Sequence, residues 1–209
     1  MIRVKICGIT NAADALAAIE AGANLLGFNF YEKSPRYIAE IEAAKIRLQL
    51  PKKVEAVGIF VNASAADLTA LCKLLKLNAA QLHGDEVPET VAEVSRNVPV
   101  WKAFRVEPDF HLKTLDEYPE AFAFLFDAAH TGQYGGTGRT TDWDVARRAA
   151  AGHRIILAGG LKVENVAAAV RIVRPYAVDV ASGVESRPGK KDHGRMREFI
   201  QEVRRGERK

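Results

Sequence analysis

Two residues at the ends of predicted strands, Cys7 and Asp127, carry groups suited to proton transfer. A thiolate and a carboxyl group that face each other can act as general base and general acid. Cysteine is a poor base at its reference pKa of about 8.5, but a nearby lysine or a helix N-terminus favours the thiolate. A partly desolvated carboxyl group can be held protonated. Each residue also has a structural interpretation, Cys7 as a small buried hydrophobe and Asp127 as a cap of the following loop.

The segments before these two residues alternate between apolar and polar side chains, as strands with one packed face do. In residues 2–7 the isoleucines and valine should pack against helices, so Lys5 and Cys7 point to the other side. In residues 122–127 three phenylalanines take the packed face, which directs Asp127 away from the helices. The same alternation places four further polar residues at the strand ends or on the inner side: Asn29, His83, Arg105 and Asp179. For His83, a satisfied structural role is at least as good an interpretation as a functional one.

Short β-branched or aromatic runs alternate with Ala/Leu/Glu-rich amphipathic stretches along the whole chain. The runs predict strands at 2–6, 24–30, 54–61, 79–83, 99–106, 122–127, 154–158 and 177–181. The stretches between them predict helices near 11–21, 38–49, 64–76, 86–96, 109–117, 142–151, 163–173 and 192–205. Asn11, Ser64 and Asp142 are suitable N-caps for three of these helices.

A repeat of about 25 residues is the length of one strand, one helix and two short loops. Strictly alternating strands and helices imply a parallel sheet, and eight units imply a single (β/α)8 barrel over residues 1–209. The alternative is an open doubly wound sheet, but the turn after the first strand reads CGIT and lacks the glycine-rich dinucleotide motif. A barrel places the active site at the C-terminal ends of its strands. It also makes the first and last strands neighbours, so Lys5 and Asp179 could form an ion pair inside it.

Two glycine segments follow the last two predicted strands, AGGL at 158–161 and ASGVES at 181–186. Barrels of this type commonly hold a phosphate there through backbone amides, although tight turns would also explain the glycines. A third segment, YGGTGRT at 134–140, superficially resembles a P-loop. It has Gln133 where the first glycine should stand and Arg139 in place of the lysine. We therefore expect it to form a mobile loop over the mouth.

Composition narrows the function classes. Of the 209 residues, 48% are hydrophobic and 27% charged, which is typical of a globular protein. No apolar run is long enough for a membrane span, and the first residues show no secretory signal. Two cysteines indicate a reducing cytoplasm, with Cys72 on a helical apolar stripe. The net charge of +4 lacks the basic face that nucleic-acid binding needs and suits a small anionic substrate. No metal-ligand spacing occurs, so we expect no metal and no cofactor.

Seven segments in order carry a family resemblance: KICGIT, FYEKSPRYI, QLHGDE, FDA, GGTGRTTDW, LAGGL and DVASGVESRPGKKD. Together they resemble phosphoribosylanthranilate isomerase from residue 3 to about 192. The resemblance implies the Amadori rearrangement of N-(5-phosphoribosyl)anthranilate in tryptophan biosynthesis. It implies Cys7 as general base, Asp127 as general acid and Arg36 as the contact of the anthranilate carboxylate. It further suggests these phosphate contacts: Gly159, Gly160, Ser182 and Gly183. Lys5, Asn29, His83 and Gly136 complete the candidate substrate contacts. A monomer and a homodimer both remain open.

Four rival interpretations have weaker support. The histidine-pathway isomerase performs the same rearrangement on a doubly phosphorylated substrate, but it resembles two half-barrels that each hold a phosphate. Here the glycine segments lie only in the second half, and the first strand ends in Cys7 rather than in an aspartate, which also disfavours a dual-substrate enzyme. A sugar-phosphate lyase or epimerase would usually need a late Schiff-base lysine or a metal. A catalytically silent phospholigand-binding barrel would not need both Cys7 and Asp127.

Overall fold

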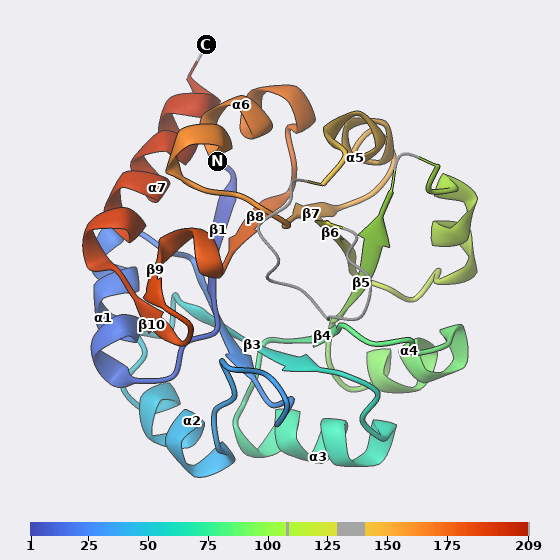
Figure 1. The fold of residues 1–209 in the computed structure, drawn as a ribbon. Helices are drawn as coiled ribbons and strands as arrows, with labels where there is room; N and C mark the ends of the chain where they lie inside the picture. The colour runs from blue at the N-terminus through green and yellow to red at the C-terminus, as the bar shows by residue number, and fades with distance from the viewer. Residues whose placement is uncertain (108, 129–140, 209) are drawn as a thin grey trace.

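The computed structural model describes residues 1–107, 109–128 and 141–208, apart from the side chain of Ala128. Within these residues, eight parallel strands close into a barrel in sequence order, with β8 paired to β1 (Figure 1). The strands are β1 (Arg3–Cys7), β2 (Leu25–Asn29), β3 (Glu55–Phe60), β4 (Ala79–Leu82), β5 (Val100–Val106), β6 (Ala123–Ala128), β7 (Ile155–Leu157) and β8 (Ala177–Val180). The predicted barrel is confirmed, and each strand end falls within one residue of its prediction.

Helices surround the barrel between successive strands (Figure 1). They are α1 (Ala12–Ala21), α2 (Glu40–Arg47), α3 (Ala65–Leu74), α4 (Pro88–Ser95), α5 (Trp143–Ala149), α6 (Val163–Val173) and α7 (His193–Glu207). The predicted N-caps Asn11, Ser64 and Asp142 are confirmed, since each side chain accepts a hydrogen bond from an amide of the first turn. Within the part that the structure describes, no helix is both long and apolar enough to cross a membrane.

The helix expected at 109–117 is instead a short 3₁₀-helix, η1 (Leu112–Glu117). Pro119 follows it closely, and the residue before a proline is disfavoured in the α conformation. A segment this short gains too few i to i−4 hydrogen bonds to hold the α form.

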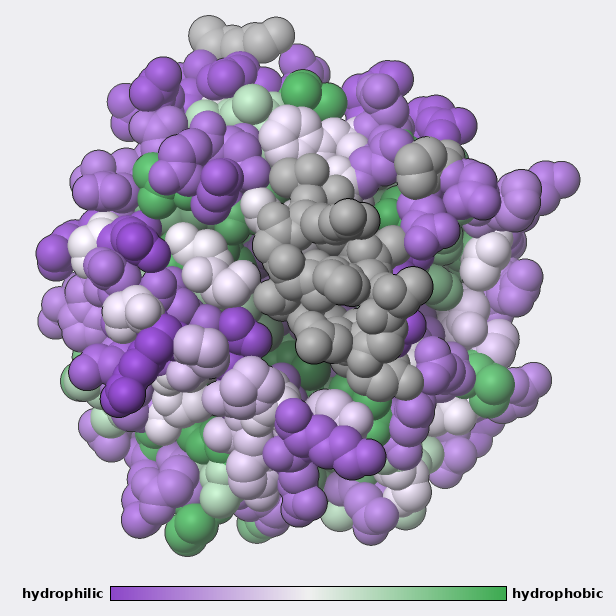
Figure 2. Space-filling view, in the orientation of Figure 1, coloured by the Kyte–Doolittle hydropathy of each residue, from purple (hydrophilic) through white to green (hydrophobic). Residues whose placement is uncertain are grey.

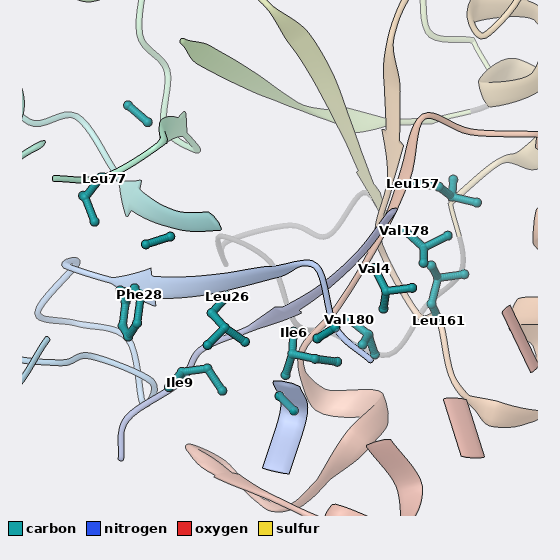
Figure 3. Packing of buried hydrophobic residues seen from close by; sticks show 14 of the residues in the cluster. Val4, Ile6, Ile9, Leu26, Phe28, Leu77, Leu157, Leu161, Val178 and Val180 are labelled. Carbon is teal, nitrogen blue, oxygen red and sulfur yellow. The ribbon is translucent and has the colours of Figure 1, made fainter. Parts of the chain in front are cut away.

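The apolar face of each strand packs against the helices and forms the layer between strands and helices. Val4 and Ile6 of β1 are fully buried there together with Leu26 and Val180 from the two neighbouring strands (Figure 3). Their intervening residues therefore point into the barrel, as the alternation predicts. This layer fixes the direction of every inward side chain of β1, including Cys7.

The barrel interior is filled by a second, smaller cluster, led by Leu25, Val57, Trp101, Leu125 and Ile156. Lys5 shares this interior and is fully buried, with its Nζ atom 3.1 Å from Oδ1 of Asp179. The two residues are register partners across β1 and β8. The predicted internal ion pair is therefore confirmed.

A small hairpin that the sequence patterns did not predict lies between β8 and α7. It follows a single 3₁₀ turn, η2 (Ser182–Val184), and pairs β9 (Glu185–Arg187) with β10 (Lys190–Lys191). The hydroxyl of Thr10 donates to the carbonyl of Gly189 at 2.6 Å, and the amide of Lys191 donates to Asp14 at 2.9 Å. These bonds tie the hairpin to the β1–α1 connection and to the first turn of α1 (Figure 1).

Candidate active site

A cavity of about 520 Å³ opens at the C-terminal ends of the strands, where a barrel places its chemistry. Mostly hydrophilic side chains cover the helices and loops around this end of the molecule (Figure 2). Strands β1, β2, β3, β4, β6 and β8 and the loops after β2, β7 and β8 contribute its walls. Eight of the residues predicted from the sequence line it: Cys7, Asn29, Arg36, His83, Asp127, Gly159, Gly160 and Ser182. Asp179 lines it as well.

Two expectations about the mouth need correction. Lys5 was expected to contact the substrate, but its side chain is fully buried beneath the cavity and does not line it. Arg105 was expected at the rim of the site, but its side chain is exposed and does not line the cavity either. It lies beside Asp127 in the register of β5 and β6.

The remaining predicted residues lie outside the cavity wall or outside the described residues. Gly183 does not line the cavity, but a Cβ atom there would come within 2.0 Å of the carbonyl oxygen of Leu161. Glycine is therefore required for the loops after β7 and β8 to pack against each other. Gly136 and the segment 134–140, predicted as a loop over the mouth, lie outside the described residues.

Cys7 is partly exposed and borders the cavity above the Lys5–Asp179 pair. Burial and the Asp179 carboxylate raise the pKa of the Cys7 thiol, although the positive charges of Lys5 and Lys191 oppose this. Burial also opposes the charge on Lys5, but Asp179 and Cys7 outweigh it and raise the pKa of Lys5. Burial thus disfavours the thiolate of Cys7, while the buried cation of Lys5 lies close enough to stabilise it.

Asp127 enters the cavity from β6, which β7 separates from β8, and is mostly buried. Its Oδ2 atom lies 3.3 Å from Nε2 of His83. The other ring nitrogen of His83, Nδ1, lies 2.7 Å from Nε2 of Gln81. A mostly buried carboxyl group that is oriented by a neighbour is suited to general acid catalysis.

Arg36 reaches the cavity from the loop after β2 and is held from behind by Glu185. Its Nε and Nη2 atoms donate to the two carboxylate oxygens of Glu185 at 2.9 and 2.8 Å. Glu185 also accepts from the buried Lys191 at 2.8 Å. Burial raises the pKa of Glu185, but Arg36 and Lys191 outweigh it and hold that pKa below its usual range. The Arg36 guanidinium therefore has a fixed orientation, with three of its five N–H groups left for other partners.

Glycine shapes the site at two points. Gly8 has φ +73°, and a Cβ atom there would lie 2.6 Å from Cδ of Arg36, so glycine lets Arg36 approach the strand that carries Cys7. Gly159 and Gly160 also have positive φ values, 75° and 64°, in the loop after β7. The side chain of Asn165, in the first turn of α6, donates to the carbonyl of Gly160 at 2.9 Å and fixes this turn. Such backbone can approach an anion closely.

Three residues that matter for this geometry were missed from the sequence: Gln81, Glu185 and Lys191. Gln81 could have been found, since it shares the inward parity of His83 two residues later. Glu185 and Lys191 lie in a short hairpin without hydrophobic periodicity, so no sequence pattern indicated that Glu185 would bind both Arg36 and Lys191. In the described ranges 1–107, 109–128 and 141–208, no group of three or more His, Cys, Asp or Glu residues could hold a metal ion.

Comparisons with known proteins agree with this geometry. The family model for N-(5'phosphoribosyl)anthranilate (PRA) isomerase matches residues 4–202. The N-(5'-phosphoribosyl)anthranilate isomerase of Pelobacter propionicus is 50% identical over 200 residues, which are 96% of this chain and 94% of that protein. The crystal structure of phosphoribosyl anthranilate isomerase from Thermotoga maritima is 41% identical, with a TM-score of 0.91 over 98% of this chain and 99% of its own. A phosphoribosyl anthranilate isomerase in complex with reduced 1-(O-carboxyphenylamino)-1-deoxyribulose 5-phosphate is 40% identical, with a TM-score of 0.88 over the same shares. The chain therefore belongs to the N-(5'-phosphoribosyl)anthranilate isomerase family.

Proposed function

We propose that the chain catalyses the Amadori rearrangement of N-(5-phosphoribosyl)anthranilate to 1-(2-carboxyphenylamino)-1-deoxyribulose 5-phosphate, a step of tryptophan biosynthesis. The observation that carries this proposal is that Cys7 and Asp127 line one cavity from β1 and β6. The rearrangement moves protons and conserves oxidation state overall. One base and one acid in the wall of a single cavity therefore match its chemical needs.

In the proposed reaction, Asp127 first donates a proton to the ring oxygen of the ribose. The bond between that oxygen and C1′ breaks, and the anilino nitrogen supplies the electron pair that forms the C1′=N double bond of a protonated Schiff base. Cys7, as thiolate, then removes the proton from C2′. The released pair forms C1′=C2′ and returns the electrons to nitrogen, giving an enolamine that tautomerises to the aminoketone. The raised pKa of the thiol makes its proton transfer dependent on the nearby cations of Lys5 and Lys191.

The two anionic ends of the substrate have separate candidate partners. The three remaining N–H groups of Arg36 suit the anthranilate carboxylate, because guanidinium and carboxylate form charge-assisted hydrogen bonds. The loops after β7 and β8 offer the backbone at Gly159, Gly160 and Ser182 to the phosphate. Clamping both ends would fix C2′ near the thiol, which is how orientation lowers a barrier.

The two cysteines suit the expected cytoplasmic location. Cys7 and Cys72 are both free thiols, as expected in a reducing cytoplasm. Burial raises the pKa of Cys72 to about 12, which fits a structural thiol. We expect no cofactor, because the acid–base pair covers both proton transfers.

The test is the loss of the fluorescence of phosphoribosylanthranilate on adding the purified protein. We expect turnover by the unmodified chain, and an inactive folded protein would refute the proposal. Arg36→Ala should raise KM about 10- to 100-fold with a smaller change in kcat, since a charge-assisted hydrogen bond contributes about 1.5–3 kcal/mol. The exposed Arg187, on β9 of the same hairpin, provides the matched control Arg187→Ala. An unchanged KM in Arg36→Ala would argue against the carboxylate contact.

A further inference from the structure

A chain of polar contacts runs beneath the cavity from the ion pair under Cys7 to the carboxyl group of Asp127. Nζ of Lys5 donates to Oε1 of Gln81 at 2.8 Å. Nε2 of Gln81 lies 2.7 Å from Nδ1 of His83, and Nε2 of His83 lies 3.3 Å from Oδ2 of Asp127. Lys5 and Gln81 are almost entirely buried, so water does not compete for the contact between them.

The direction of every hydrogen bond in this chain follows from its first member. A lysine ammonium group can only donate, so Gln81 must turn its carbonyl oxygen toward Lys5. The amide nitrogen of Gln81 then faces His83, and because it too can only donate, Nδ1 of His83 must accept. A neutral imidazole that accepts through Nδ1 carries its hydrogen on Nε2, which faces Asp127.

The arrangement also opposes a positive charge on His83. An imidazolium ring would carry a hydrogen on Nδ1 and point it at the amide hydrogens of Gln81 across 2.7 Å. Among the described residues, Lys5 and Asp179 lie below this part of the barrel, Asp127 lies beside the ring, and Arg105 is the register partner of Asp127 on β5. The ammonium group of Lys5 holds the amide of Gln81 in the orientation that excludes the second proton.

The loop that carries His83 is fixed by a second set of contacts. The His83 amide donates to the carbonyl of Phe60 at 2.8 Å and so continues the β3–β4 ladder. The next amide, of Gly84, donates to the carboxylate of Glu86, which also forms an ion pair with the buried Lys102 at 2.9 Å. The ring therefore cannot easily drift away from Asp127.

We propose that Gln81 and His83 are positioning residues for the acid of the reaction. The ring holds Oδ2 of Asp127 as an acceptor and so fixes the orientation of the carboxyl group that transfers the proton. His83 therefore orients the acid and does not itself transfer a proton to the substrate. This inference rests on the proposed function for its kinetic consequence, but the tautomer of His83 follows from the contacts alone and is measured separately.

The tautomer is read by two-bond ¹H–¹⁵N correlation spectroscopy of ¹⁵N-histidine-labelled protein. The chain has five histidines, and the signal of His83 is the one absent from His83→Gln. At neutral pH we expect Nδ1 to be unprotonated and Nε2 to carry the hydrogen. A protonated Nδ1 in the unmodified protein would overturn the proposal.

Gln81→Glu is the sharpest perturbation, because it keeps the shape and replaces the donor that faces Nδ1 by an acceptor. His83 should then gain a hydrogen on Nδ1, visible in the same spectrum, and kcat should fall at least tenfold. Gln201→Glu, on the exposed side of α7, makes the same chemical change away from the site and should alter neither reading. A Gln81→Glu variant with an unchanged His83 spectrum would refute the assigned polarity.

His83 itself is tested by a pair of variants. His83→Leu removes the donor to Asp127, and we expect kcat to fall up to about 100-fold with little change in KM, as for a misplaced catalytic group. His83→Gln offers an amide N–H near the position of Nε2 and should recover most of that loss. Equal losses in both variants, or a full kcat in His83→Leu, would refute the positioning role. An unmodified protein that shows the expected tautomer but no turnover would instead refute the proposed function.

Discussion

Replacing Glu185 by glutamine should weaken both the fold and the binding of the substrate carboxylate, because this side chain joins two cations. The carboxylate is 4% exposed and accepts two hydrogen bonds from Arg36 and one from Lys191. Lys191 is fully buried, and burial lowers its pKa even though Glu185 and Cys7 oppose that effect. Glutamine has the same shape but removes the charge that compensates both neighbours.

The structure sets the size of both effects. Removing one partner of a buried ion pair costs about 3–5 kcal/mol, and glutamine keeps one acceptor oxygen, so we expect a loss of about 3 kcal/mol in unfolding free energy. Glu185 also orders Arg36, and ordering an arginine side chain costs about 1.5–2 kcal/mol in rotamer entropy. That cost would then fall on substrate binding and raise KM about tenfold.

Urea unfolding and the fluorescence assay measure the two effects on the same protein sample. Glu42→Gln is the matched control, since Glu42 forms an exposed ion pair with Lys45 on α2 and should change neither value measurably. A stable Glu185→Gln variant with an unchanged KM would refute the account of Arg36. Lost stability with an unchanged KM would limit Glu185 to a structural role.

Two further predictions concern titration. Asp179→Asn removes the negative charge that helps to raise the pKa of Cys7, so the alkylation rate of Cys7, followed by mass spectrometry against pH, should reach half its maximum at a lower pH than in the unmodified protein; an unmoved profile would contradict the assigned cause. Asp14 is buried, which raises its pKa, but hydrogen bonds from the Lys191 amide, His193 and Asn11 outweigh burial and lower it. A carboxyl group with a lowered pKa stabilises the fold fully above its unfolded pKa of about 3.9. At about pH 6 the unmodified protein should therefore exceed Asp14→Asn by about 1–3 kcal/mol in the free energy of unfolding by urea. That difference should shrink as the pH falls below about 4. A difference that stays constant down to about pH 3 would show that Asp14 titrates normally.

The barrel, and the inward direction of the site residues on its strands, could be predicted because both depend on local periodicity. Two-residue alternation directs Cys7 and Asp127 inward, and the eight-unit repeat closes the sheet so that their strand ends share one mouth. The same rule gave the ion pair between Lys5 and Asp179. It also placed Lys5 too near the substrate, since inward parity does not say how far below the rim a side chain lies.

What sequence patterns could not supply is the partner of each polar side chain. The meeting of Arg36 with Glu185 joins residues 149 positions apart through a hairpin that has no hydrophobic alternation. Arg105 shares the parity of inward residues, yet its side chain is exposed at the end of its strand. The chain from Lys5 to His83 through Gln81 depends on the closed barrel and on donor polarity, which composition does not encode.

In the proposed mechanism, Cys7 and Asp127 perform the two proton transfers of the rearrangement. The most direct test is the turnover rate of folded Cys7→Ala and Asp127→Asn variants at saturating phosphoribosylanthranilate. Because a positioned acid or base contributes about 100- to 10,000-fold, each variant should lose at least about 100-fold in kcat while keeping its cooperative unfolding. Turnover within a few-fold of the unmodified protein in either variant would contradict the assignment of that residue.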